Sequence, residues 1–470
     1  MTLDPRTKRL LPWLVAIAFF MQTLDGSILN TALPRMANDL GESALRMQAV
    51  VVSYLLTLAL LIPASGWLAD RFGTRRVFIG AIALFSLGSL LCAMSSSLGL
   101  LVASRVVQGV GGALLLPVGR LAILRVFPKP ELLSALSFVA VPGLLGPLVG
   151  PSLGGWIVEV ATWHWVFLIN LPVGAAGAVF ALRHMPDLRR PVDRFDTVGF
   201  GLFSAGLLLA TLALQGLGER AFSGAASLLM LVVSLAAMVA YWLHAVRHER
   251  PLFSPALFHI PTFAVGLAGN LFARLGSGAM PFLLPLFLQL GLGYSPARAG
   301  MSLIPMAVGA MLCKSFAAPL IRRAGYRRVL GINTVLLGAM IASFAAVGPA
   351  LPSAALLSML GILGVINSLQ FTAMNTLTLG DLGPTQASSG NSLLSVVMQL
   401  SMSLGVAAAA ALLAAFAGAL PLPGSATLMH AFQATFISIG AMAAASALIF
   451  LQLRPGEQPD RTRPGAVEEG

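Results

Sequence analysis

Long apolar runs alternate with short polar segments along nearly the whole chain. A membrane-spanning helix needs about 20 consecutive, mostly apolar residues, and the chain holds fourteen runs of about that length. They lie near residues 11–33, 47–69, 77–96, 98–120, 132–158, 165–183, 197–216, 225–245, 262–290, 298–320, 328–348, 353–377, 389–418 and 430–452. The pattern predicts an all-α integral membrane protein with 14 transmembrane helices.

Lysine and arginine collect in every second loop between these runs. With the N-terminus placed inside, the inside segments hold basic clusters within residues 6–9, 71–76, 125–129, 183–194, 247–250, 322–328 and 454–463. The outside segments hold only Arg35, Arg46, Arg220 and Arg298. Because basic loops favour the cytoplasmic side, we predict a multi-pass protein of the cytoplasmic (inner) membrane with both termini in the cytoplasm.

The composition supports a lipid-covered surface. Soluble domains carry roughly 25% charged residues, whereas this chain has 10% charged and 57% hydrophobic residues. Its net charge of +12 is spread over the loop clusters rather than gathered in a patch, so we expect no nucleic-acid partner. The two cysteines lie inside apolar runs, and no metal-ligand cluster, phosphate-binding loop or Ser/His/Asp set stands out. We therefore expect no metal, no cofactor and no enzyme activity.

Two similar segments indicate an internal repeat. Residues 66–77 close the second run and residues 318–329 close the tenth, each with a glycine followed by paired arginines. A two-fold repeat of six-helix bundles with two helices inserted between them would place the segments eight runs apart. We predict four parts: a six-helix bundle (1–185), two extra linker helices (186–255), a second six-helix bundle (256–453) and a disordered cytoplasmic tail (454–470).

Two opposite charges lie well inside apolar runs. Asp25 lies about 8 residues from the outer end of the first run, and Arg105 about 7 from the outer end of the fourth. At 1.5 Å per residue both are roughly 11–12 Å below the outer surface, so they can pair or compete. A carboxylate among apolar helices is a candidate proton carrier, and a nearby arginine opposes its protonation until the geometry changes. The alternative is an ion pair that only locks the two helices together.

Five segments of the N-terminal half carry a family resemblance. Residues 24–34, 66–76, 105–112, 146–155 and 163–172 resemble, in order, the first-helix signature, motifs A, B and C and a following signature of the major facilitator superfamily, in its fourteen-span drug:proton antiporter branch. The resemblance implies a fold of two six-helix bundles with two additional helices, and alternating access across a membrane. In that branch motif C marks antiporters.

Motif A implies a gate. Its residues here are Gly66, Asp70, Arg71, Gly73, Arg75 and Arg76. The resemblance implies that Asp70 faces the start of the thirteenth span, near Ser388 and Ser389, where the helix dipole favours negative charge. A topology signal would explain the two final arginines but neither Asp70 nor Gly73. In the second copy Arg322 takes the place of Asp70, so that copy is given no gating role.

Motifs B and C add a polar set and a packing surface. Motif B supplies Arg105, Gln108 and Gly109, and motif C supplies Gly146, Pro147, Gly150, Pro151, Gly154 and Gly155. Glycines at three- and four-residue spacing allow a neighbouring helix to approach closely, and the prolines bend the helix. Such packing suits a carrier whose bundles rock, although glycine-rich interfaces are common in membrane proteins.

Several polar residues inside the runs are candidates for a substrate cavity. They are Asn30, Asn270, Arg274, Gln289, Asn367, Gln370 and Asn375. Arg274 is the one basic residue well inside the C-terminal half, where it could meet an anionic substrate or instead cap backbone carbonyls.

The leading hypothesis is a monomeric, proton-coupled antiporter that exports drugs or other small organic compounds. Its partners would be protons, the substrate and the lipid bilayer. A second hypothesis, motivated by Arg274, is an exporter of a specific metabolite such as a carboxylate or a metal chelate. A third, a channel or a non-transporting sensor, leaves motifs A and C unexplained.

Overall fold

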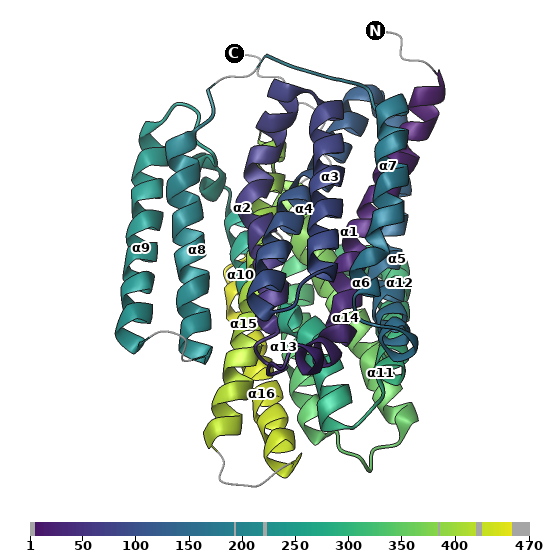
Figure 1. The fold of residues 1–470 in the computed structure, drawn as a ribbon. Helices are drawn as coiled ribbons and strands as arrows, with labels where there is room; N and C mark the ends of the chain where they lie inside the picture. Colours follow the sequence, from purple (N-terminus) through teal and green to yellow (C-terminus); the bar gives the residue numbers. More distant parts are fainter. Residues whose placement is uncertain (1–4, 192–193, 220–222, 384–385, 420–424, 454–470) are drawn as a thin grey trace.

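The computed structural model describes residues 5–191, 194–219, 223–383, 386–419 and 425–453, and every element in these ranges is helical (Figure 1). The first part of the chain forms α1 (Pro5–Asp39), α2 (Gln48–Phe72), α3 (Thr74–Ala93), α4 (Leu98–Val126), α5 (Lys129–Val160), α6 (Trp165–Leu168) and α7 (Asn170–His184). Next come α8 (Thr197–Glu219), α9 (Gly224–Arg247) and the short η1 (Pro255–His259). The last part forms α10 (Pro261–Leu286), η2 (Phe287–Gly291), α11 (Pro296–Ser302), α12 (Ile304–Ala324), α13 (Tyr326–Ser343), η3 (Phe344–Ala346), α14 (Ser353–Gly380), α15 (Ala387–Ala419), α16 (Ser425–Ala445) and α17 (Ala447–Phe450).

These helices confirm the predicted all-α membrane architecture. Within the described residues, thirteen helical stretches are long and apolar enough to cross a bilayer. The 32-residue helix α5 coincides with the remaining predicted run, 132–158. Five of the predicted runs are interrupted helices, formed by α6 with α7, α10 with η2, α11 with α12, α13 with η3, and α16 with α17. Large apolar side chains such as Leu228, Leu229 and Leu235 on α9 are exposed, as a lipid-facing surface requires.

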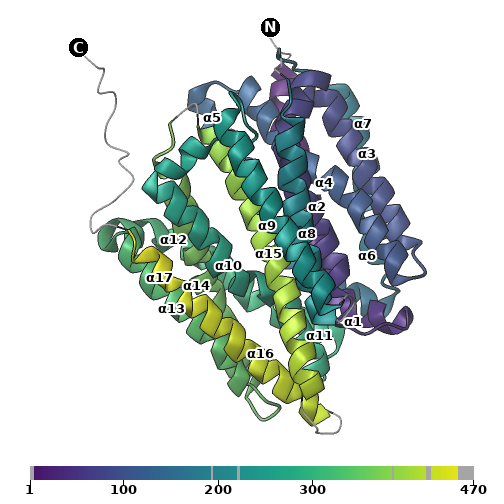
Figure 2. The same cartoon turned by 90° about the vertical axis from the view of Figure 1, so that its left-hand side faces the viewer.

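The helices form two groups and a side hairpin (Figure 2). In the N-terminal half, α1 packs on α5, α4 packs on α2 and α3, and α7 packs on α1 and α3. In the C-terminal half, α10 packs on α14 and α15, α12 packs on α14, and α13 packs on α16. The domain boundaries at residues 185, 255 and 453 stay predictions, and the tail 454–470 lies outside the described residues.

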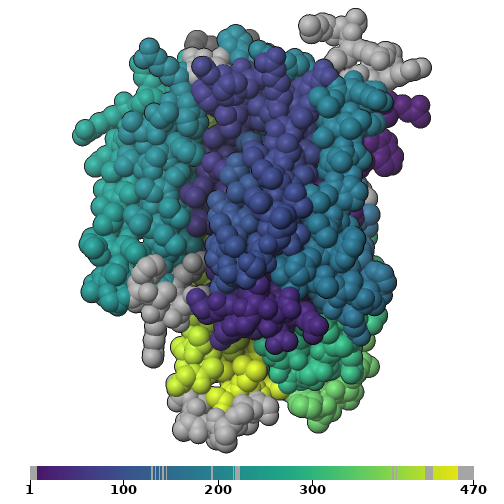
Figure 3. Space-filling model, viewed as in Figure 1, coloured from purple at the N-terminus to yellow at the C-terminus, as the bar shows by residue number. Residues whose placement is uncertain are grey.

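Helices α8 and α9 form a hairpin beside the two halves, seen at the left of Figures 1 and 3. They pack on each other, and α8 packs on α15 and on α2, so the hairpin contacts both halves. A cluster of buried apolar residues holds it there, with Phe203 and Leu207 of α8 packed among residues of α2 and α15.

Among the described residues, the hydrogen bonds between the two halves lie at one end of the molecule, and α2 also packs on α15. We call the end where α1 begins the basic end, because it carries the arginine clusters, and the other the opposite end. At the opposite end, Ser152 Oγ donates to the Gly300 carbonyl at 3.2 Å, and the Ala297 N–H donates to Glu159 at 3.1 Å. Toward the basic end, a pocket of about 300 Å³ lies between α4, α5 and α15, lined by Arg120, Leu124, Leu136, Val139 and Asn391.

Candidate functional site

Asp25 and Arg105 form a buried ion pair inside the N-terminal half. Asp25 lies on α1 and Arg105 on α4, and each side chain is about 1% exposed. Arg105 Nη1 donates to Asp25 Oδ2 at 2.7 Å. The equal depths estimated along the two helices therefore correspond to a direct contact.

Amide side chains complete the contacts of the carboxylate. Gln108 Nε2 and Asn170 Nδ2 each donate to Asp25 Oδ1 at 2.8 Å. Both amides also donate to Ser89 Oγ, at 2.8 Å and 3.3 Å. Asp25 is thus bound by residues of α4 and α7, with α3 behind them. Charged hydrogen bonds of this kind are stronger than neutral ones.

Arg105 is held from three directions. Its Nε donates to the Val50 carbonyl at 3.3 Å and its Nη1 donates to Gln108 Oε1. Its guanidinium lies 4.1 Å from the ring centre of Tyr54, a cation–π contact. The arginine is therefore fixed to α2 as well as to α1, and it keeps several partners if Asp25 becomes neutral.

Sequence reasoning missed Asn170, Ser89 and Tyr54 as members of this network. Asn170 belongs to the segment 163–172 that carries the family resemblance, which was the available signal. For Ser89 and Tyr54 the sequence offered none, because a polar residue in an apolar run does not show which neighbour it faces.

The glycines of motif C fit α5 closely against α1. A Cβ on Gly150 would overlap Ser27, and one on Gly154 would overlap the carbonyl oxygen of Ile28. The same face is hydrogen-bonded, since Ser27 Oγ donates to the Gly146 carbonyl at 3.0 Å. Gly155 lies on another face, where a Cβ would overlap the Pro296 carbonyl of the C-terminal half. In motif B, Gly109 allows the same close approach of α4 to Thr57 on α2.

The two prolines of motif C differ in their surroundings. The Pro151 carbonyl accepts from Thr31 Oγ1 of α1 at 3.0 Å, and it also lies against Gly300 of the C-terminal half. Pro147 is exposed within α5.

Motif A is fastened to its own half at the basic end. Asp70 forms an ion pair with Arg125 at the end of α4, a partner that the family resemblance did not indicate. Gly73 has φ +94°, and a Cβ there would overlap Asp187 in the segment after α7. Thr74 Oγ1 donates to the Pro186 carbonyl at 2.7 Å in the same segment.

The remaining motif A residues are at the surface of this end. Arg71 lies 5.4 Å from the ring centre of Trp67, Gly66 and Arg76 are exposed, and Arg75 is partly exposed. The side chain of Ser388, which the gating interpretation involved, lies outside the described residues.

Arg274 is buried in the C-terminal half, and no acidic side chain among the described residues pairs with it. It is 8% exposed, its Nη2 donates to Asn270 Oδ1 at 3.3 Å, and its guanidinium lies 4.8 Å from the ring centre of Phe371. Its Nε is buried and has no hydrogen-bond partner. Asn375 on α14 and Asn30 on α1 also have a buried side-chain oxygen without a partner.

The other cavity candidates have different surroundings. Gln370 is buried between α13 and α14, donating to Thr334 Oγ1 and accepting from Asn333. Gln289, in the π-helical turn η2, donates to the Thr31 carbonyl of α1 at 3.0 Å and so joins the two halves near the opposite end. Asn367 is half-buried on α14.

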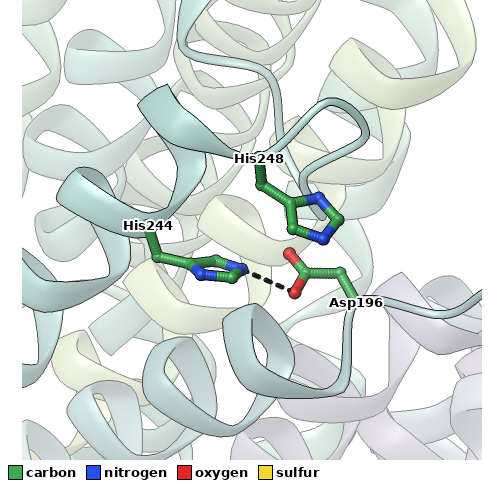
Figure 4. Close-up of side chains that lie close together, drawn as sticks. All are labelled: Asp196, His244 and His248. Atoms are coloured by element: carbon green, nitrogen blue, oxygen red, sulfur yellow. Dashed lines mark hydrogen bonds and ion pairs between the residues drawn. The ribbon is translucent and has the colours of Figure 1, made fainter.

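One expectation from the sequence was wrong: a cluster of metal-ligand side chains does exist. The structure brings Asp196, His244 and His248 together at the basic end of the α8–α9 hairpin (Figure 4). The signal in the sequence was the four-residue spacing of the two histidines, which puts them on one helix face.

Comparison with known proteins identifies the family. A family model described as Major Facilitator Superfamily matches residues 15–406 and 267–470. The chain belongs to the major facilitator superfamily. Its helical membrane architecture and its relatives are those of transporters in this superfamily rather than of enzymes.

Near full-length relatives share about half of the residues. A Serratia proteamaculans (strain 568) protein is 48% identical over 96% of this chain and 94% of its own length. A protein of Escherichia coli O6:H1 (strain CFT073) is 47% identical over 96% of each chain. Both bear the name "Putative multidrug resistance protein MdtD".

Solved structures show the same fold at low sequence identity. A POT family transporter in complex with 5-aminolevulinic acid has a TM-score of 0.69 at 16% identity, covering 95% of this chain and 96% of that one. A bacterial homologue of the human lysosomal transporter Spinster, in an inward-facing and unoccupied conformation, has a TM-score of 0.68 at 16% identity, covering 96% and 97%.

Proposed function

We propose that this transporter is a proton-coupled antiporter that exports drugs or other small organic compounds across the bacterial cytoplasmic membrane. The observation that carries the proposal is the buried ion pair of Asp25 and Arg105. The arginine clusters support a cytoplasmic basic end, and the relatives named as putative multidrug resistance proteins support drugs as the substrate.

Proton binding at Asp25 has a defined effect on its surroundings. Protonation removes the negative charge that holds Arg105 Nη1 and turns one carboxylate oxygen from an acceptor into a donor. Arg105 keeps its contacts with Val50, Gln108 and Tyr54. The interaction that weakens is therefore the ion pair between α1 and α4. Its loss lowers the resistance of α1 to a shift, while Gln108 and Asn170 still donate to Asp25 Oδ1.

Helix α1 links this network to the contact between the halves. Six residues beyond Asp25, Thr31 Oγ1 donates to the Pro151 carbonyl in motif C, and the Thr31 carbonyl accepts from Gln289 of the C-terminal half. A shift of α1 on protonation would act on both bonds at once. We propose that this is how proton entry biases the two halves between closed and open at the opposite end.

The test is transport in proteoliposomes with an imposed pH gradient and ethidium as the probe. In the wild type we expect gradient-driven ethidium uptake that stops when the gradient is collapsed. Asp25→Asn should lower that rate by at least about tenfold, since each 1.4 kcal/mol of lost coupling is worth a factor of ten. Glu42→Gln removes a partly exposed carboxylate paired with Arg46 and should transport like the wild type. Wild-type rates in Asp25→Asn would remove Asp25 from the mechanism.

The buried, unpaired Nε of Arg274 favours a second candidate, an exporter of a specific metabolite such as a carboxylate or a metal chelate. The same proteoliposomes, with radiolabelled succinate in place of ethidium, distinguish the metabolite exporter from the drug exporter. Succinate flux in the wild type that is lost in Arg274→Ala favours the second candidate. Ethidium flux without succinate flux favours the first.

A further inference from the structure

Three potential metal ligands meet where the α8–α9 hairpin closes at the basic end. One ligand atom each from Asp196, His244 and His248 lies within 4.8 Å of the other two (Figure 4). Asp196 immediately precedes α8, His244 lies in the last turn of α9, and His248 caps that helix. Asp196 is buried, His244 is partly exposed and His248 is exposed, so the cluster is open to solvent on one side.

The carboxylate is held in place by neighbouring groups. Asp196 Oδ1 accepts from the Gly199 N–H at 2.8 Å, and Oδ2 accepts from the Leu252 N–H at 3.1 Å. His244 Nε2 lies 2.8 Å from Oδ1. Burial alone would raise the pKa of Asp196, but these hydrogen bonds outweigh burial and leave its pKa below the usual range. The carboxylate is therefore held in a fixed orientation beside the histidines.

We propose that Asp196, His244 and His248 form a binding site for a divalent transition-metal ion, with Zn²⁺ as the best match. Two imidazoles and one carboxylate, with remaining positions left to water, are a ligand set that zinc commonly takes. Histidines four residues apart at the end of one helix face the same side and can share one ion. The imidazoles also exclude Mg²⁺ and Ca²⁺ as preferred occupants, because those ions favour all-oxygen sites.

Little movement is needed to admit the ion. With metal–ligand bonds of about 2.1 Å in tetrahedral geometry, ligand atoms lie about 3.4 Å apart. His244 Nε2 and Asp196 Oδ1 must therefore separate slightly from 2.8 Å, while the third ligand atom moves in from within 4.8 Å. The Gly199 and Leu252 N–H groups would keep the carboxylate oriented, as outer hydrogen bonds commonly do around metal ligands.

Some charges near the site favour cation binding and others oppose it. The carbonyl end of α9 carries partial negative charge, which favours a cation beside His244 and His248. Arg247 and Arg250 are close in sequence, and the Arg250 N–H donates to His248 Nδ1 at 3.2 Å. Their positive charge opposes cation binding, so we expect affinity in the micromolar range rather than that of a closed structural zinc site.

The consequence of occupancy would be local. The ion would join the start of α8, the end of α9 and, through Leu252, the segment that leads to α10. It would therefore fix the base of a hairpin that contacts both halves. The site is independent of the proton pathway, because none of its residues belongs to the Asp25 network.

The experiment is equilibrium dialysis of the purified, full-length protein against Zn²⁺ in detergent, without a polyhistidine tag, followed by elemental analysis. We expect one Zn²⁺ per chain in the wild type. His248→Ala, an exposed change that leaves the fold intact, should weaken binding by at least about tenfold. Asp196→Asn should do the same, and His430→Ala, outside the cluster, should bind like the wild type. Co²⁺ should give visible absorption typical of a tetrahedral site in the wild type and lose it in His248→Ala.

Two outcomes would overturn the proposal. One is a wild type that holds no stoichiometric Zn²⁺ at micromolar free metal. The other is equal Zn²⁺ content in the wild type, His248→Ala and Asp196→Asn, with normal size-exclusion profiles for all three, because the metal would then sit elsewhere.

Discussion

At the scale of single residues, the buried charges of the N-terminal half compensate one another. Asp25 accepts from Arg105, Gln108 and Asn170, and Arg105 also bonds the Val50 carbonyl. Removing water from two charges is expensive, and only a complete set of partners makes burial tolerable. Removing one of the two charged side chains therefore leaves the other buried without an opposite charge.

Single and double substitutions of this ion pair should have unequal effects on stability. Arg105→Gln should lower the thermal melting temperature strongly, because an unpaired buried carboxylate costs about 3–5 kcal/mol. Asp25→Asn combined with Arg105→Gln should melt closer to the wild type than Arg105→Gln alone. Both variants can be heated in detergent, and their melting temperatures are measured from the loss of the monodisperse size-exclusion peak.

A matched control is Arg46→Gln, which breaks the exposed ion pair with Glu42 four residues away. An exposed pair of this kind contributes only about 0.2–1 kcal/mol, so the melting temperature of Arg46→Gln should barely change. Additive losses in the double variant would show that Asp25 and Arg105 do not depend on each other.

How far the sequence predicts the site depends on what kind of information each residue carries. Asp25 and Arg105 could be paired in advance because depth along a helix follows from counting residues. Asn170, Ser89 and Arg125 could not be assigned, because counting does not say which face of a helix meets which neighbour. Asp196 and His244 are 48 residues apart, and only the closure of the hairpin joins them.

At the scale of the helices, glycine decides which neighbours come close. On α5 one set of glycines meets α1 and Gly155 meets the C-terminal half, so the same motif serves two interfaces. The sequence predicted a small-residue face but not its partner helix. It also predicted one span at residues 165–183, where the structure has two helices that meet at Ile169, α6 and α7.

A single added methyl group tests the close packing. Gly154→Ala places a Cβ against the Ile28 carbonyl, which is backbone and cannot turn aside. Overpacking of this kind costs about 1–3 kcal/mol, so the melting temperature and the transport rate should both fall.

The comparison is Gly80→Ala on α3, where an added Cβ meets open space. That variant should equal the wild type or exceed it slightly, because alanine is the better helix former. If Gly154→Ala behaved like Gly80→Ala, the tight contact between α1 and α5 would have no energetic role.

At the scale of the whole molecule, the halves are hydrogen-bonded together at the opposite end and leave a pocket toward the basic end. Alternating access requires the joined end to separate. The sequence predicts two bundles but not which end is closed, because both arrangements use the same residues and differ little in energy.

A cross-link across the joined end should therefore stop transport. Glu159 Oε2 and Ser295 Oγ lie 3.3 Å apart on opposite halves. With Cys92 and Cys313 replaced by alanine, Glu159→Cys and Ser295→Cys can be bridged by a short, cleavable thiol reagent. We expect ethidium transport in proteoliposomes to be lost on bridging and restored on cleavage.

The control pair is Glu42→Cys with Arg46→Cys, which lies at the same end but within one half. Bridging that pair should leave the rate unchanged. Full transport by the molecules bridged between residues 159 and 295 would mean that this end does not open during the cycle.

The position of Asp25 has a bearing on selectivity. The carboxylate is enclosed within one half, so a compound lodged between the halves has no direct access to it in this conformation. Under the proposed mechanism the proton and the exported compound never occupy the same site. Each affects the binding of the other only through displacement of α1. Such a transporter does not require its exported substrate to carry a particular charge. The same proton influx could drive the export of cationic, neutral and anionic compounds. The side chains between the halves would then select among them.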